Sequence, residues 1–264
     1  MQQVGNSRLV IRVAGSTLSY SVLSADGNVS FVPYVVRSGV SMAANMREAF
    51  RSEALLQKLY AKTVVMVDSP VLMTPVDIYE DGDMSPLYMH AFPDCKSDVV
   101  ESTVLPDLSA VALFGVNKDL RMVITDHIPS ARFVCAMSPV WRYLHRRSFT
   151  GARRKLYGYF HDRRLDVFSF NQHRFKFCNS FDATNGKDSL YYLLYVWKQL
   201  MLKPEYDELH LVGDIPDRDM VMDELKRYLQ RAYCINPSGD FNRSHVTQIK
   251  GMPYDLMTYF IKGR

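Results

Sequence analysis

The densest run of charge in the sequence lies between residues 142 and 164. It holds eight basic side chains against one acid, for a net charge of +7. The basic residues are Arg142, Arg146, Arg147, Arg153, Arg154, Lys155, Arg163 and Arg164. Tyrosine and phenylalanine are interleaved with them, a combination that suits phosphate contacts beside stacked bases. The segment therefore predicts either an anion site, with nucleic acid as one partner, or a linker whose charges face water.

Within this segment, Arg153, Arg154 and Lys155 are the candidate anion-binding residues, because they lead directly into a predicted hairpin. Exposed charges contribute little to stability. Replacing all three by alanine is therefore expected to leave the fold intact. If the segment is an anion site, this variant should bind anions with a weaker salt dependence; if it is a linker, the variant should behave like the parent protein.

Two histidine–aspartate pairs, Asp126-His127 and His161-Asp162, have the side chains of a catalytic dyad. Adjacent residues of a strand point to opposite faces, so turn or strand-edge positions are favoured for both pairs. The seven histidines have no metal-binding spacing, and the sequence has no nucleophile elbow, no GxxxxGK phosphate loop and no GxGxxG fingerprint. These motifs therefore predict no metal site and no catalytic residue.

The composition is that of a globular protein. Of 264 residues, 47% are apolar and 23% are charged, and the formal net charge is +4. These values exclude disordered, collagen-like and disulfide-scaffold classes. The four cysteines form no CxxC pair, and no apolar run resembles a signal peptide or reaches the roughly 20 residues of a spanning helix. We predict a soluble, cytoplasmic protein without a membrane span.

The elements that would position these residues occur in two similar halves. In the first half, alternating residues in 9–23 and 29–36 predict strands. Ser41 predicts the N-cap of a helix that reaches about Tyr60, and the apolar run 63–67 is typical of a strand buried on both faces.

The second half repeats this order. Its predicted strands are 155–160, 165–170 and 175–181. A helix follows from about Asn185 to Lys203 with Met201 facing inward, and 209–212 is again a short apolar strand. Further segments predict strands at 111–116, 122–125 and 131–137 and helices at 139–147, at 217–233 and from Pro253.

Equivalent strands of the two halves are separated by a nearly constant distance along the chain. The pairs Leu18–Leu165, Val32–Cys178 and Val67–Val212 have offsets of 147, 146 and 145 residues. The offsets predict a structural duplication with domains 1–150 and 151–264. Chance agreement between common α and β patterns is the alternative.

This order resembles that of the actin-like ATPases, the class of actin, hexokinase and Hsp70, and of an uncharacterised bacterial family with that fold. The resemblance covers nearly the whole chain and rests on residues 9–36, 67–70, 209–214 and 253–256. It implies an α/β fold of duplicated, ribonuclease H-like halves with mixed sheets and an inter-half cleft. In this class two hairpin turns hold the phosphates of a nucleotide, and a glycine turn holds its adenosine.

The first phosphate turn of active members reads Asp-x-Gly-Ser/Thr. The acid holds metal-bound water, and the other residues let backbone N–H groups approach phosphate. In this sequence Val13 stands at the acid position, with Arg12 beside it. The glycine and hydroxyl residues remain as Gly15, Ser16 and Thr17. A valine can neither bind a metal nor polarise water, so the resemblance does not extend to ordinary hydrolysis.

The second phosphate turn, normally Asp-x-Gly, matches residues 161–164, where Asp162 and Arg163 retain an acid and lack the glycine. The adenosine turn, normally two glycines, is Gly213-Asp214. The resemblance thus implies that these turns, with Gly15 to Thr17, contact a nucleotide, and that ATP with magnesium is the cofactor to expect.

We therefore predict a degenerate actin-like protein, an interaction or scaffold module with an unidentified protein partner that retains nucleotide binding without efficient hydrolysis. One alternative is an active ATPase that uses Asp162, Asp68 or Asp214 in place of the missing acid. The other is an RNA-binding accessory protein that uses the basic segment.

Overall fold

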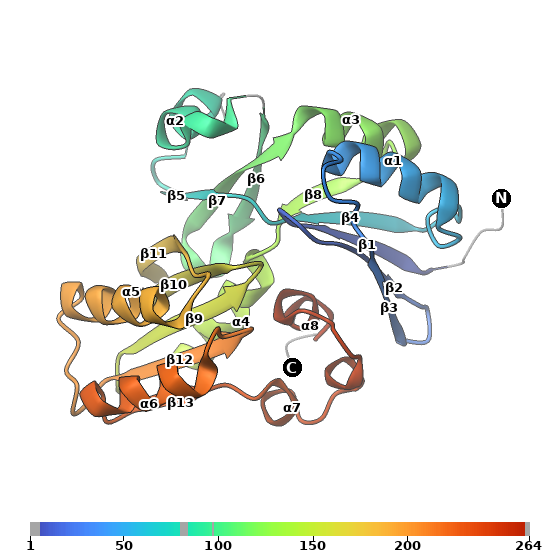
Figure 1. The fold of residues 1–264 in the computed structure, drawn as a ribbon. Coiled ribbons are helices and arrows are strands. Elements are labelled where there is room, and N and C mark those ends of the chain that lie inside the picture. The colour runs from blue at the N-terminus through green and yellow to red at the C-terminus, as the bar shows by residue number, and fades with distance from the viewer. Residues whose placement is uncertain (1–5, 80–83, 97, 262–264) are drawn as a thin grey trace. The chain divides into compact units, whose positions relative to one another are not determined.

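The computed structural model describes residues 6–79, 84–96 and 98–261. The chain divides into two compact units, Met1–Leu105 with Val111–Ser138, and Pro106–Ala110 with Pro139–Arg264. Each unit contains a five-stranded mixed sheet (Figure 1).

The sheet of the first unit has the order β3-β2-β1-β4-β8. Its strands are β1 (Arg8–Val13), β2 (Leu18–Leu23), β3 (Val29–Tyr34), β4 (Lys62–Val67) and β8 (Arg132–Cys135). β1 pairs antiparallel with β2 and parallel with β4. Because β1 is central, Leu9, Val10 and Ile11 are buried almost completely. The turn that follows β1 is thus anchored by the core of the unit.

Two neighbouring helices, α1 (Met42–Ser52) and α3 (Lys118–His127), lie along this sheet (Figure 1). Each begins at a capping side chain: Ser41 accepts a hydrogen bond from Ala44 N, and Asn117 accepts one from Leu120 N. The Phe50 and His127 rings stack at 4.1 Å and join the two helices.

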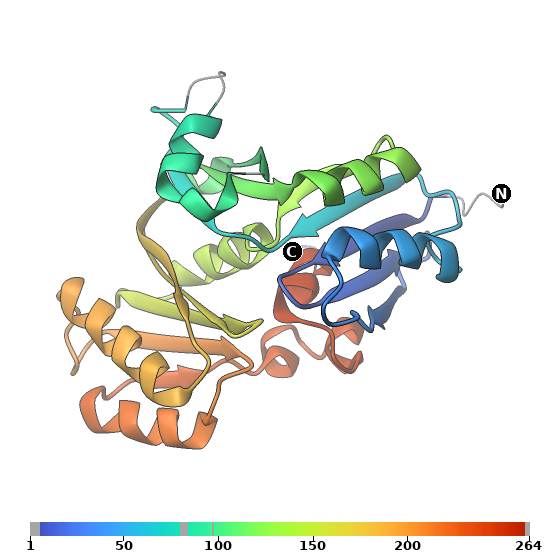
Figure 2. The same cartoon turned by 45° about the horizontal axis from the view of Figure 1, so that its top comes forward.

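An insertion between β4 and α3 forms a third sheet of order β5-β7-β6 (Figure 2). Its elements are β5 (Val71–Pro75), α2 (Ser85–Ala91), the 3₁₀ turns η1 (Pro93–Cys95) and η2 (Pro106–Leu108), β6 (Asp98–Leu105) and β7 (Ala110–Asn117). Tyr88 is fully buried against Val111 and Leu113, and its hydroxyl donates to Pro70 O. The insertion therefore has a small core of its own.

The sheet of the second unit has the order β11-β10-β9-β12-β13, which corresponds strand for strand to the first sheet. Its strands are β9 (Lys155–His161), β10 (Arg164–Asn171), β11 (Arg174–Asp182), β12 (Glu208–Gly213) and β13 (Ala232–Cys234). The shared order, with the same antiparallel and parallel pairings, confirms the predicted duplication of mixed α/β halves.

Helices cover both faces of the second sheet. α5 (Gly186–Gln199) and α6 (Arg218–Tyr228) pack on the face that carries Leu165 and Val167. α4 (Ser138–Ser148) packs on the other face, where Trp141 contacts Phe175 and His145 contacts Phe170. The chain ends with α7 (Pro237–Asp240), the 3₁₀ turn η3 (His245–Gln248) and α8 (Tyr254–Phe260). Packing thus assigns nearly all of α4 to the second unit, whereas the predicted halves divide after residue 150.

Several sequence-based boundaries were wrong. α1 ends at Ser52 rather than near Tyr60, because Glu53 is extended and a turn buries Leu56. Residues 122–125 belong to α3, since the capped start at Asn117 places Leu120, Val123 and Ile124 on one buried face.

The ends of the other two long helices were also placed too late. α6 stops at Tyr228, and Ala232–Cys234 forms the edge strand β13, which pairs with β12. α5 stops at Gln199, and Met201, expected to face inward, is 80% exposed with a positive φ of 48°. No helix in the part of the chain that the structure describes is both long and apolar enough to cross a membrane.

Candidate functional site

The first candidate phosphate turn joins β1 to β2. Ala14 N donates to Thr17 O at 2.9 Å, and Gly15, Ser16 and Thr17 are exposed. A Cβ added to Gly15 would meet no atom within 4 Å. The fold itself therefore does not require this glycine, and the space beside the turn is open.

A cation rather than an acid stands beside this turn. Val13 is buried at the end of β1, and the Arg12 guanidinium, also buried, donates from Nη1 to Thr17 Oγ1 at 3.0 Å. Asp68 follows β4, and its backbone N–H donates to Val13 O at 2.8 Å. Arginine stays charged at all physiological pH values, so the turn has a permanent positive charge.

The second candidate turn is the two-residue hairpin between β9 and β10. Asp162 and Arg163 have positive φ values of 43° and 64°, and His161 pairs with Arg164 in the strand register. Two consecutive residues with positive φ are the mark of a type I′ turn, which normally contains glycine. The turn therefore keeps a tight conformation although its glycine is replaced.

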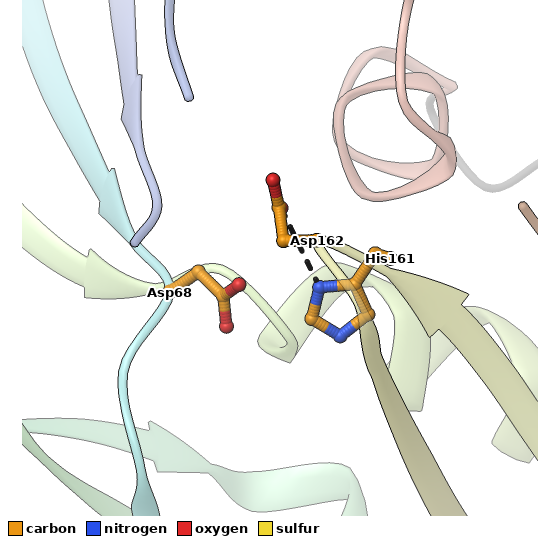
Figure 3. Close-up of side chains that lie close together, drawn as sticks. All are labelled: Asp68, His161 and Asp162. Atoms are coloured by element: carbon orange, nitrogen blue, oxygen red, sulfur yellow. Dashed lines mark ion pairs between the residues drawn. The ribbon is translucent and has the colours of Figure 1, made fainter. Parts of the chain in front are cut away.

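His161 is held between two carboxylates of its own unit. Its Nδ1 lies 3.7 Å from Asp162 Oδ2 (Figure 3). Its Nε2 makes a very short contact with Asp166 Oδ2, and its ring stacks on Tyr159. Burial alone would raise the pKa of Asp166, but the hydrogen bond and charge of His161, together with Arg164, hold that pKa below its ordinary value.

An imidazole fixed in this way by a carboxylate has the arrangement of a proton-transfer group or a metal ligand. Within the second unit, His161 and Asp162 offer two of the ligands that a divalent cation needs. Asp68, at the end of β4 in the first unit, also carries a carboxylate (Figure 3). Histidine spacing along the sequence gave no indication of these ligands.

The third candidate turn follows β12. Gly213 has a φ of +97°, and a Cβ added there would lie 1.9 Å from Phe160 O. Asp214 N donates to the same carbonyl at 3.0 Å. The close approach of β9 therefore requires glycine at residue 213 whether or not a nucleotide binds, while Asp214 is exposed.

The basic segment is held mainly by ion pairs inside the second unit. Arg142 and Arg146 contact Asp107, Arg147 contacts Asp240, Arg153 contacts Glu208, and Arg154 contacts Asp207. Lys155 is buried and donates from Nζ to the carbonyls of Ser148 and Thr150. The predicted anion-binding residues thus each have partners that hold the fold.

Two functional features were missed in the sequence. The His161–Asp166 contact joins diagonal positions of a hairpin whose turn is 162–163. The predicted turn, 161–164, is two residues longer and does not indicate this contact. Apart from its position next to Val13, nothing in the sequence indicated a role for Arg12.

Comparisons place the chain among known folds. A family model described as protein of unknown function (DUF3822) matches residues 1–231. No curated protein matches the chain in sequence. A crystal structure from Bacteroides thetaiotaomicron, a protein with actin-like ATPase fold and unknown function, is 26% identical, with a TM-score of 0.84 over 94% of this chain and 97% of that chain.

A structure of the PilM–PilN type IV pilus biogenesis complex is also similar. It has a TM-score of 0.51 and 12% identity over 88% of this chain and 89% of that chain. The two matches show that the fold is that of the actin-like ATPases, as the order of elements predicted.

Proposed function

The chain belongs to the DUF3822 family and has the actin-like ATPase fold, and on this premise we propose that it is a degenerate member of that class. It acts in the cytoplasm as an interaction or scaffold module, and it does not hydrolyse ATP efficiently. The observation that carries the proposal is the buried Val13 at the first turn, with the Arg12 guanidinium bonded to Thr17.

A hydrolytic site of this class needs a carboxylate at the first turn, because the acid orients metal-bound water. Val13 supplies no ligand, and the Arg12 charge disfavours a divalent cation beside it. The same charge favours phosphate. Nucleotide binding without dependence on magnesium is therefore the chemistry that these residues support.

We place the nucleotide contacts of this proposal at the three turns described above. Gly15, Ser16 and Thr17 have exposed backbone beside a cation, and Asp162-Arg163 is a tight hairpin turn with a second cation. Gly213-Asp214 is the third turn. Arg153, Arg154 and Lys155 are left out of the proposed site, because their ion pairs and hydrogen bonds favour a structural role over RNA binding.

A protein partner is the second part of the proposal. PilM, which shares the fold, is found in a complex with PilN. A protein whose nucleotide site has lost the acid that positions water can still recognise a partner through its surface.

The first test is ATP turnover with magnesium, which we expect to be negligible. A rate on the order of 1 per second or more would overturn the proposal. In that case Asp162→Asn, Asp68→Asn and Asp214→Asn identify the acid that replaces the missing one.

The second test is equilibrium binding of ATP with magnesium or with EDTA. We expect equal affinities in both. We expect at least tenfold weaker binding in Gly15→Val, whose side chain occupies the open space beside the turn and whose Cβ meets no atom of the fold within 4 Å. Arg163→Gln is expected to weaken binding similarly, and Arg174→Gln, in the next hairpin, serves as its matched control. Unchanged ATP binding in both Gly15→Val and Arg163→Gln contradicts the proposed contacts.

A further inference from the structure

A row of ring side chains crosses the second sheet from strand to strand. Tyr157 of β9 lies opposite Phe168 of β10 and His210 of β12, and His210 lies opposite Tyr233 of β13. The ring centroids are separated by 5.7, 5.5 and 5.3 Å in turn. Phe168 and Tyr157 are buried, whereas Tyr233 at the sheet edge is 46% exposed.

The exposed end of this row is the wall of a cavity that lies wholly in the second unit. The cavity has a volume of about 530 Å³, and its lining includes Arg147 of α4, Glu208, His210 and Tyr233 of the sheet, and Asn236 and Asp240 at α7. Small-molecule sites have volumes of about 300–1,000 Å³. None of these residues belongs to the three turns of the proposed nucleotide site.

The carboxylates and the guanidinium of the cavity wall differ in how many of their hydrogen-bonding positions are occupied. Glu208 is bonded to both Arg153 and His210, and Asp240 is bonded to Tyr143 and Arg147. The carboxylates are therefore satisfied. Arg147 has five N–H donors, and Asp240 is its one side-chain partner among the described residues, so several donors remain for a ligand.

The row also contains a hydrogen-bond donor without a partner in the described part of the chain, the hydroxyl of Tyr157. The Tyr157 hydroxyl is buried and has no hydrogen-bond partner among the residues that the structure describes. A buried hydroxyl without a partner costs free energy, so such a group calls for a ligand or a water molecule. Tyr157 does not line the cavity, so the remaining donors of Arg147 are the groups that favour a ligand with acceptor oxygens there.

The local charge limits the ligand further. The lining itself holds Arg147 against Glu208 and Asp240. Arg153 and Lys155 lie beside Glu208 outside the lining and bring the surroundings to one net positive charge, with His210 neutral because burial lowers its pKa. A single negative charge matches this balance. A triphosphate would place several negative charges against two carboxylates in the wall.

We propose that this cavity binds a small aromatic carboxylate, whose flat body stacks on Tyr233 and His210 and whose carboxylate accepts hydrogen bonds from Arg147. The ring row supplies the planar surface, because aromatic groups prefer stacked or edge contacts at centroid distances of about 4.5–7 Å. The guanidinium supplies the paired N–H groups that match a carboxylate.

The test uses 2-naphthoate as the probe, measured by titration calorimetry against the full chain. Two analogues separate the features: 2-naphthamide lacks the charge, and decalin-2-carboxylate lacks the flat ring. We expect each analogue to bind about tenfold more weakly than naphthoate. Absence of naphthoate binding at millimolar concentration, or equal affinity for naphthamide, overturns the proposal.

Variants locate the site. Tyr233→Ser is expected to weaken naphthoate binding by about fivefold, and Tyr228→Ser, an exposed tyrosine outside the cavity, is expected to leave it unchanged. Arg147→Gln is expected to weaken it at least tenfold, with Arg146→Gln as the neighbouring control. Equal effects of a variant and its control contradict the assignment. If Arg147→Gln does not fold, the Tyr233 pair and the naphthamide comparison decide.

The proposed nucleotide site and the proposed carboxylate site can be tested independently. ATP binding is measured with Gly15→Val and naphthoate binding with Tyr233→Ser, and neither substitution touches residues of the other site. Competition of ATP with naphthoate would show that the cavity is part of a nucleotide site, which contradicts the inference drawn for it.

Discussion

Arg154→Ala is the substitution that best tests whether the basic segment carries exposed charges or charges that hold the fold. If Arg154 is an exposed charge, its removal costs little stability, as the sequence suggested. In the structure its Nη2 lies 2.6 Å from Asp207 Oδ2, and the Asp207 side chain is 1% exposed. The same nitrogen donates to Met201 O at 2.8 Å. Truncation therefore leaves a buried carboxylate without its cation.

The expected loss follows from this burial. Removing one partner of a buried ion pair costs about 3–5 kcal/mol. The Arg154 side chain is 45% exposed, and the backbone N–H groups of Lys203 and Arg154 still donate to Asp207. Both facts lower the cost, so we expect about 2–3 kcal/mol in the free energy of unfolding. The sequence predicted that alanine at residues 153–155 leaves the fold intact. From the structure we instead expect this triple variant to be destabilised.

Urea denaturation of four variants measures this loss. Arg142→Ala is the matched control, because its pair with Asp107 is exposed on both sides and should contribute at most about 0.5 kcal/mol. A double-mutant cycle of Arg154→Ala with Asp207→Asn isolates the pair, and we expect a coupling energy of about 2 kcal/mol. If Arg154→Ala costs no more than Arg142→Ala, the reasoning from burial is refuted.

Three further predictions concern single residues. Arg163→Gly should raise the free energy of unfolding by about 0.5–1 kcal/mol, because glycine relieves the positive φ at a smaller entropic cost; destabilisation in urea contradicts the type I′ turn. Gly213→Ala should lower the free energy of unfolding by at least about 3 kcal/mol. The control Gly27→Ala, where φ is also positive but no atom lies within 4 Å of the added Cβ, should lower it by about 1 kcal/mol, and equal losses argue against the contact with Phe160. Burial lowers the pKa of His145, whose Nε2 must donate to Gln172 O and whose Nδ1 is buried without a partner among the described residues. The unfolded chain therefore takes up a proton first, so stability should fall as pH drops below about 6.5, and denaturation of His145→Phe at several pH values should show a smaller fall.

The order of elements could be predicted because each depends on local patterns. Ser41 was predicted as a cap and Asn185 as the approximate start of a helix, and both side chains accept a backbone hydrogen bond as N-caps. The nearly constant offsets reflect a similar spacing of equivalent elements, since β1, β2, β3 and β4 begin at residues 8, 18, 29 and 62, and β9, β10, β11 and β12 begin at residues 155, 164, 174 and 208. Helix ends were less predictable. Leu229 and Ala232 fit the buried face of the longer helix that was predicted over 217–233, and they are equally buried in the turn and strand that follow α6 in the structure.

The candidate site was predictable only in part. The missing acid at Val13 is visible in the sequence, because the position follows from the turn. The partners of the basic segment are not, since Arg142 meets Asp107 and Arg154 meets Asp207 across 35 and 53 residues. No periodicity encodes such long-range pairs. The row from Tyr157 to Tyr233 depends in the same way on strand order and register.

The insertion between β4 and α3 has a consequence for folding kinetics. In the second unit, β12 is followed almost at once by α6 and then β13, whereas in the first unit residues 68–117 separate β4 from α3. Closing a loop of about fifty residues rather than about four costs about 2 kcal/mol more in chain entropy before β8 can pair with β4. Although the two sheets have the same order, we expect them to form at different rates, with the second sheet complete while the first still lacks its edge strand.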